Sequence, residues 1–264
     1  MYSTSYHRAS SIEDAGKLLA GSEDGKYVAG GQTLIATMKQ RLAQPSDLVD
    51  LRHVPSMKGI SVDGRDVTIG AAVTHAEVAS SALLKSLCPA ICHLAGMIGD
   101  PHVRHLGTIG GSIANNDPAA DYPAAMLGLG ATIVTDRREI PADDFFLGLF
   151  ETALWEGEII TAVRFRAPEK AGYAKFANPA SRFAMTGVFV SKAESGVRVA
   201  VTGAGSNGVF RHSGMESALS ASWSPQALAN VTIDATDLMS DLHCSADYRV
   251  NLIKVMAKRA VASA

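Results

Sequence analysis

The stretch Val28-Ala29-Gly30-Gly31-Gln32-Thr33-Leu34 decides the fold, together with a later stretch, Thr108-Ile109-Gly110-Gly111-Ser112. We call them the first and second glycine segments. Each leads from a predicted strand or loop, through paired glycines, into a stretch that can become helical. Paired glycines flanked by Thr, Ser or Gln let backbone N–H groups approach a phosphate, because no Cβ stands in the way. Together the two segments predict one long anionic ligand held at both ends, such as a dinucleotide.

Length and composition describe an ordinary globular chain and exclude several classes of partner. The 264 residues predict two or three compact units. A net charge of −2 gives no basic surface for nucleic acid or anionic membranes. No apolar run approaches the roughly 20 residues of a membrane span. Residues 1–8 lack the apolar stretch of a signal peptide, so a cytoplasmic location is expected.

The cysteines and histidines predict neither a disulfide framework nor a metal centre in this chain. Only three cysteines are present, Cys88, Cys92 and Cys244, whereas a [2Fe–2S] cluster usually needs four thiolates. We expect them to be small apolar core residues. The histidines near the second glycine segment lack matching carboxylate or thiolate partners (His93, His102 and His105).

Patterns along the chain divide it into three predicted units, 1–55, 56–166 and 167–264. The first has the alternation of a βαβαβ-like unit. The second opens with a hairpin around Asp63-Gly64 and then a capping box, Thr74–Glu77, which begins a helix. The third contains a predicted hairpin over 187–202, a proline-initiated helix at Ser224-Pro225 and an amphipathic helix over 247–262.

Each glycine segment also has a simpler interpretation. The first could be only a tight turn, and it matches neither a Walker loop nor the full dinucleotide fingerprint. The second is more specific, because Thr108, Ser112, Asn115 and Asp121 add polar groups around it. A carboxylate such as Asp121 can accept hydrogen bonds from ribose hydroxyls. Its alternative is an Asx-rich loop that satisfies its own turns.

Motifs over nearly the whole chain resemble one family. They are residues 29–34, 98–104, 108–112, 117–121, 141–146, 157–160, 173–176 and 247–249. In this order they are similar to the FAD-binding medium subunit of molybdenum hydroxylases, of the carbon monoxide dehydrogenase type within the xanthine dehydrogenase superfamily.

This resemblance implies an α+β fold. An FAD-binding domain of the vanillyl-alcohol-oxidase or PCMH type, made of two α/β subdomains, would precede a C-terminal antiparallel sheet with helices. FAD would lie between the subdomains, with its pyrophosphate held by residues 29–33 and 108–112. Phe183 stands where relatives often carry a flavin-stacking tyrosine, within a Ser181–Ala184 stretch that departs from the family pattern at Arg182. The expected cofactor-binding residues are Ala29, Gly30, Gly31, Gln32, Thr33, Leu34, Ile98, Thr108, Gly110, Gly111, Ser112, Asn115, Asp117, Asp121, Ile160, Lys175 and Phe183.

The resemblance also implies a place in an electron-transfer chain. A large subunit with a molybdenum–pterin centre would hydroxylate the substrate, and [2Fe–2S] clusters of a small subunit would pass electrons to FAD and on to an external acceptor. The assembly would be an αβγ heterotrimer or a dimer of heterotrimers, and the isolated chain would oxidise no organic substrate. The alternatives are a stand-alone FAD oxidase of the same fold and a non-enzymatic nucleotide-binding module.

Overall fold

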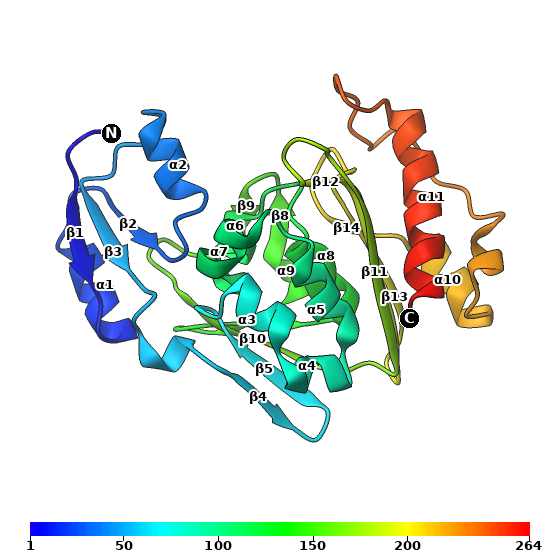
Figure 1. Ribbon diagram of the computed structural model, residues 1–264, viewed down its shortest axis with the longest axis horizontal. Helices are drawn as coiled ribbons and strands as arrows, with labels where there is room; N and C mark the ends of the chain where they lie inside the picture. Colours follow the sequence, from blue (N-terminus) through cyan, green and yellow to red (C-terminus); the bar gives the residue numbers. More distant parts are fainter.

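The computed structural model describes residues 1–264, and its N-terminal part is a parallel sheet of three strands (Figure 1). Across the sheet the order is β1 (Ser5–Arg8), β3 (Asp47–Asp50) and β2 (Gly25–Val28). The connecting helices are α1 (Ile12–Ala20) and α2 (Leu34–Lys39). Successive strand residues point to opposite faces, so Leu48 packs with Met38 of α2 while Val49 belongs to the cluster that holds Ala15 of α1. The predicted βαβαβ-like unit is confirmed.

The middle of the chain forms an antiparallel sheet of five strands. The order is β4 (Ile60–Asp63), β5 (Asp66–Gly70), β10 (Ile160–Arg166), β6 (Thr132–Thr135) and β7 (Glu139–Pro141). The hairpin predicted at Asp63-Gly64 is confirmed, but its turn is shifted by one residue. Asp63 pairs with Asp66, which leaves Gly64 and Arg65 in the turn, and Gly64 takes the positive φ of +59° that suits glycine.

Short helices lie between β5 and β6 and carry the second glycine segment. They are α3 (His75–Ser80), α4 (Ala82–Leu87), α5 (Pro89–Gly96), α6 (Pro101–Leu106), α7 (Ile109–Asn115) and α8 (Tyr122–Leu129). A 3₁₀ helix, η1 (Pro55–Met57), lies earlier in the chain, before β4. After β7 come α9 (Ala142–Phe145) and a small hairpin of β8 (Phe146–Gly148) and β9 (Glu151–Thr152). Thr74 caps α3 through the predicted capping box with Glu77.

The C-terminal part is an antiparallel sheet of four strands between two helical layers (Figure 1). The order is β11 (Lys170–Ala177), β12 (Ala184–Ala193), β13 (Gly196–Thr202) and β14 (Phe210–Arg211). α11 (Ala246–Ala262) and α10 (Ser213–Ala221) cover one face, and α5 and α8 pack on the other. The predicted helix at Ser224-Pro225 is only a 3₁₀ turn, η2 (Pro225–Leu228).

Arg249 ties α11 to the sheet beneath it. Its buried guanidinium donates to the carbonyls of Met185 and Gly203 and pairs with Asp241 at 2.7 Å. At Gly172 of β11 a Cβ would lie 1.9 Å from the Ala260 carbonyl oxygen, so only glycine allows α11 to pack this closely. The motif at 247–249 therefore has a structural role.

All three cysteines are buried, as expected of core residues. Burial raises the pKa of the Cys88 thiol to about 12 and that of Cys92 to about 11. The thiolate form, which is the nucleophile and metal ligand, is therefore strongly disfavoured at both positions.

Candidate functional site

A cavity of about 660 Å³ opens where the three parts of the chain meet. Its lining comes from the first glycine segment, the helices α6 and α7, the loop before α8, the start of β10, and the loop 181–183. A volume in this range is typical of cofactor pockets, and most of the surface exposed inside it is apolar although polar side chains are also among its lining residues. Distant parts of the sequence therefore contribute to one concave site.

The structure brings the predicted site residues together at this cavity. All of them line it except Lys175, which lies behind it. The predicted residues on the lining are Ala29, Gly30, Gly31, Gln32, Thr33, Leu34, Ile98, Thr108, Gly110, Gly111, Ser112, Asn115, Asp117, Asp121, Ile160 and Phe183.

The two glycine segments lie against each other. A Cβ on Gly30 would lie 2.3 Å from the Leu106 carbonyl oxygen and 2.5 Å from Gly107 Cα, just before the second segment. A Cβ on Gly110 would lie 2.5 Å from the Ala71 Cβ. These glycines are needed for backbone to approach backbone. The two segments therefore lie side by side on one part of the cavity wall, as the prediction that both hold one pyrophosphate requires.

The first glycine segment offers a row of free backbone donors. The N–H groups from Gly30 to Leu34 donate no hydrogen bond within the chain, although these residues line the cavity. Gly31 has a φ of +68°, the left-handed conformation that turns successive N–H groups into a concave anion-binding nest. Gly30, Gly31 and Leu34 are half-buried, and N–H groups in such places are normally paired, so this row fits the diphosphate of a dinucleotide cofactor.

The second glycine segment differs from the expectation, because its backbone donors are already used. Ile109 donates to the Val73 carbonyl at 3.0 Å, Gly110 to the Ala71 carbonyl at 2.9 Å, and Gly111 to Thr108 Oγ1 at 3.1 Å. Its glycines let α7 pack tightly against the chain that precedes α3. The groups it leaves for a ligand are the Ser112 and Asn115 side chains, which make no hydrogen bond within the chain.

Asp121 forms a buried ion pair at the inner wall of the cavity. Its carboxylate lies 3.0 Å from Lys175 Nζ and accepts a hydrogen bond of 2.5 Å from Tyr173. Burial raises the pKa of the Asp121 carboxyl, and the Lys175 charge opposes this shift. Both carboxylate oxygens thus have partners within the chain, and Asp121 also lines the cavity, so its role towards a ribose hydroxyl stays a prediction.

Lys175 also fixes the loop that carries Phe183. Its Nζ donates to the Arg182 carbonyl at 3.0 Å. Arg182 has a φ of +63°, and its guanidinium donates to the Gly99 carbonyl at 3.3 Å across the cavity mouth. Phe183 follows and is 48% exposed at the edge of the cavity. Lys175 therefore holds the loop in place from behind the cavity, and Phe183 provides an apolar surface at the cavity edge.

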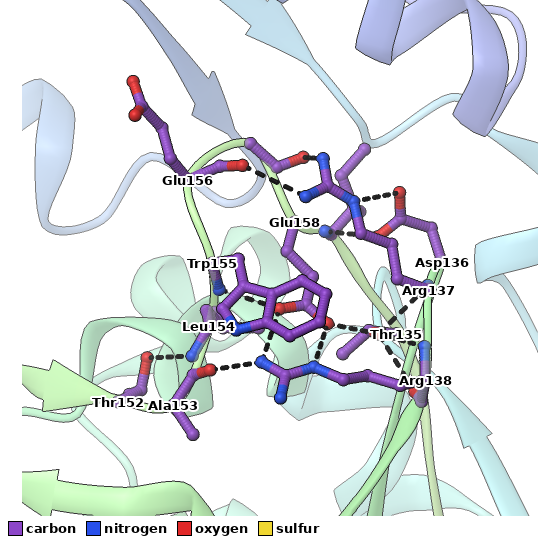
Figure 2. Close-up of polar contacts among 12 residues, drawn as sticks. Thr135, Asp136, Arg137, Arg138, Thr152, Ala153, Leu154, Trp155, Glu156 and Glu158 are labelled. Carbon is purple, nitrogen blue, oxygen red and sulfur yellow. Dashed lines mark hydrogen bonds and ion pairs between the residues drawn. The ribbon is translucent and has the colours of Figure 1, made fainter.

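Sequence reasoning missed several lining residues. Glu158 and Ile159 stand in the quoted motif 157–160, but only Ile160 was expected at the site; Figure 2 shows the polar contacts of Glu158. His75 was accounted for as part of a helix start. The other missed lining residues include Ala71, Gly99, Val103, Leu154, Ser181 and Arg182. Gly99 and Val103 stand in the quoted motif 98–104, and Ser181 and Arg182 in the quoted stretch 181–184. Ala71 and Leu154 carry no local ligand signal, so only their spatial placement identifies them.

His75 is a neutral imidazole enclosed in the cavity wall. Its ring centroid lies 5.4 Å from that of Tyr122, and its Nδ1 is buried without a hydrogen-bond partner. A Cβ on Gly107 would lie 2.6 Å from His75 Nε2, so the ring packs directly under that glycine. Burial, with a smaller contribution from the nearby Arg104 charge, lowers the pKa of His75 to about 4.

Because His75 is buried in its neutral form, it should lower the stability of the folded chain at acidic pH. The folded chain binds the imidazole proton less tightly than the unfolded chain, whose pKa is near 6.5, so stability falls as the pH drops from 6.5 towards about 4. Between pH 7 and pH 5 the free energy of unfolding should fall by about 2 kcal/mol more in the wild type than in His75→Gln. Urea unfolding at both pH values measures this. His102→Gln, which removes a 97% exposed imidazole, is the matched control. Equal losses in wild type and His75→Gln would contradict the prediction.

Comparison with known proteins identifies the class to which this fold and cavity belong. Residues 2–168 match the FAD binding domain in molybdopterin dehydrogenase, and the chain belongs to this family. The fold is thus the predicted α+β fold with a PCMH-type FAD-binding domain, and the chain is placed among FAD-binding subunits of molybdenum-containing oxidoreductases.

Individual relatives match over nearly their whole length. The carbon monoxide dehydrogenase medium chain of Hydrogenophaga pseudoflava is 34% identical, over 98% of this chain and 96% of the relative. The nicotine 6-hydroxylase medium subunit of Paenarthrobacter nicotinovorans is 36% identical, over 98% and 96%. A chain of reconstituted CO dehydrogenase from Oligotropha carboxidovorans superimposes with a TM-score of 0.89 at 33% identity, over 99% of this chain and 97% of that one. Among the helices of the structure, none combines the length and apolarity that crossing a membrane requires.

Proposed function

We propose that this chain is the FAD-carrying electron-transfer subunit of a molybdenum hydroxylase. The observation that carries the proposal is the row of free N–H groups from Gly30 to Leu34, facing a cavity that an apolar wall completes. Family membership supports FAD as the ligand. When bound, FAD would accept electrons from the [2Fe–2S] clusters of a small subunit and deliver them to an external acceptor.

The side chains of this protein would bind and orient the cofactor. The first glycine segment would bind the diphosphate through backbone N–H groups, and Ser112 and Asn115 would add polar contacts. Ile98, Ile160 and Phe183 would provide the apolar surface for the flavin ring, and Phe183 can stack but cannot donate a hydrogen bond. Lys175 would act indirectly, by holding Asp121 and the loop 178–183 in place.

The partners follow from the same proposal. A large subunit would hold the molybdenum–pterin centre and bind the organic substrate, and a small subunit would hold the iron–sulfur clusters. The names of the relatives support this division, since they are medium chains of enzymes for substrates as different as carbon monoxide and nicotine. We propose an αβγ heterotrimer or a dimer of heterotrimers in the cytoplasm. Within the chain, 1–55 and 56–166 would be the FAD-binding subdomains and 167–264 the C-terminal domain.

The isolated chain tests this proposal. Purified alone and supplied with FAD, it should bind one flavin per chain, release all of it on acid precipitation, and oxidise no organic substrate, because substrate would bind in another subunit. Absorbance of the flavin, its release, and turnover with purified substrates and an artificial acceptor measure this. Turnover by the chain alone, or flavin that stays covalently attached, would instead favour a stand-alone oxidase. A chain that binds no flavin would overturn both.

A further inference from the structure

Glu158 is the most completely hydrogen-bonded carboxylate at the cavity (Figure 2). Its side chain is fully enclosed, with 0% exposure. One oxygen accepts from the Thr135 hydroxyl at 2.7 Å and from Arg138 Nε at 3.0 Å. The other accepts from Arg138 Nη2 at 2.9 Å and from the Trp155 backbone N–H at 2.7 Å. A planar guanidinium and a carboxylate bound in this two-point manner fix each other's orientation.

The turn between β6 and β7 also holds the segment before β10, residues 153–159. Arg138 donates to the Ala153 carbonyl, and its Cζ lies 3.8 Å from the centre of the Trp155 ring. Asp136 accepts from the Ile159 N–H at 2.8 Å. Arg137 donates to two further carbonyls of the segment, each at 3.3 Å (Glu156 and Gly157). Residues 153–159 are therefore held to the β6–β7 turn by hydrogen bonds along their length. Glu158 is the residue of the segment that adds an ion pair, with Arg138.

The opposite side of this segment is a cavity wall. Leu154, Glu158 and Ile159 line the cavity next to Ile160. Although burial raises the pKa of Glu158, hydrogen bonds from Arg138, Trp155 and Thr135 outweigh it and lower the pKa to about 2. The carboxylate thus stays ionised at neutral pH, and the attachment does not depend on pH in that range.

We propose that Glu158 is a positioning residue for the cofactor: through Arg138 and Trp155 it holds the wall 154–160 in the place that flavin binding requires. This inference rests on the proposed function. The expected effect of the Glu158–Arg138 pair differs from that of an ion pair that only stabilises the fold. Loss of the Glu158 charge should weaken flavin binding more than loss of a comparable ion pair elsewhere in the chain, and it should change the surroundings of Trp155.

Trp155 offers a direct spectroscopic readout of the wall. The chain has two tryptophans, and Trp223 packs at the edge of the C-terminal core, away from the cavity lining. In a Trp223→Phe background, tryptophan fluorescence reports Trp155 alone. There, Glu158→Gln should bind FAD at least about tenfold more weakly, because charged hydrogen bonds to Arg138 are lost, and Trp155 emission should change before any FAD is added.

The matched control is Asp241→Asn, which breaks the Arg249–Asp241 pair of the C-terminal part in the same chemical way. It should lower the melting temperature without weakening FAD binding and without changing Trp155 emission. FAD affinity is measured by flavin fluorescence titration. The inference is overturned if Glu158→Gln binds FAD like its parent, if Asp241→Asn weakens binding equally, or if Trp155 emission stays unchanged.

A second variant covers the case in which Glu158→Gln does not fold. Arg138→Lys keeps the charge but loses the two-point contact, and it should show a smaller loss of FAD affinity with the same direction of change in Trp155 emission. Parental FAD affinity in this variant would also overturn the inference. If neither the wild type nor the Trp223→Phe parent binds FAD, the proposed function is refuted, which is a result distinct from failure of this inference.

Discussion

Gly30→Ala is expected to weaken FAD binding by at least about a hundredfold. The new Cβ would lie 2.3 Å from the Leu106 carbonyl oxygen and 2.5 Å from Gly107 Cα, and both neighbours are backbone atoms that no rotamer change can move away. The two glycine segments would have to separate by about an ångström, and losing two hydrogen bonds to the charged diphosphate, at about 1.5 kcal/mol each, corresponds to about a hundredfold in affinity. Overpacking would also destabilise the fold by about 1–3 kcal/mol. Flavin titration and urea unfolding measure the two effects.

The chain offers a matched control for this substitution. Gly16 lies inside α1, and a Cβ there would meet nothing within 4 Å. Gly16→Ala should therefore stabilise the chain by about 0.5–1 kcal/mol, as is usual for helix interiors, with unchanged FAD affinity. Unaltered FAD affinity in Gly30→Ala would show that contact between the two glycine segments does not matter for the cofactor.

Lys175→Met is expected to cost about 3–5 kcal/mol of stability, because it leaves the Asp121 carboxylate buried without a cation. The variant should be less destabilised at pH 5 than at pH 8. Without Lys175, burial raises the pKa of Asp121 further, so the folded state binds the proton more tightly than the unfolded chain and stability falls as pH rises. The Arg182 carbonyl also loses its donor, so the loop next to Phe183 should loosen and FAD should bind more weakly.

Two further variants separate charge burial from other effects of this change. Adding Asp121→Asn to Lys175→Met removes the unpaired charge and should restore about 1 kcal/mol or more, with the pH dependence lost. Lys192→Met makes the same substitution at an exposed position of β12 and should stay within about 0.5 kcal/mol of wild type. A Lys175→Met protein as stable as Lys192→Met would contradict the importance of the buried pair.

Much of the fold could be read locally from the chain. Period-two patterns with turn residues predicted the hairpins β4/β5 and β12/β13, because a strand face and a tight turn are encoded by neighbours in sequence. The helix at Ser224-Pro225 was overestimated, since a good cap and an N1 proline start a helical turn but do not supply the packing that extends it.

The site was predictable in its membership and less so in its chemistry. Nearly all the residues expected from the motifs line one cavity in the structure. The motifs could not, however, show which glycine segment keeps its backbone N–H groups free. The backbone N–H groups of Gly30–Leu34 donate no hydrogen bond within the chain, whereas those of Ile109–Ser112 donate to acceptors within the chain. Likewise Lys175 and Glu158 act through contacts with residues tens of positions away in sequence.

By itself, then, the sequence determined the kind of site this protein has: two glycine segments in a fixed order, apolar and polar companions around them, and the strands and helices that present them. Only the tertiary structure decided that the two segments lie side by side, that the first supplies the free donors, and that Asp121 and Glu158 are each paired with a cation from a distant stretch of the chain. The physical reason is the separation in sequence between the residues that interact. Local pattern records the propensity of each stretch, whereas a hydrogen-bond partner or a counter-charge is settled by which distant stretch packs against it.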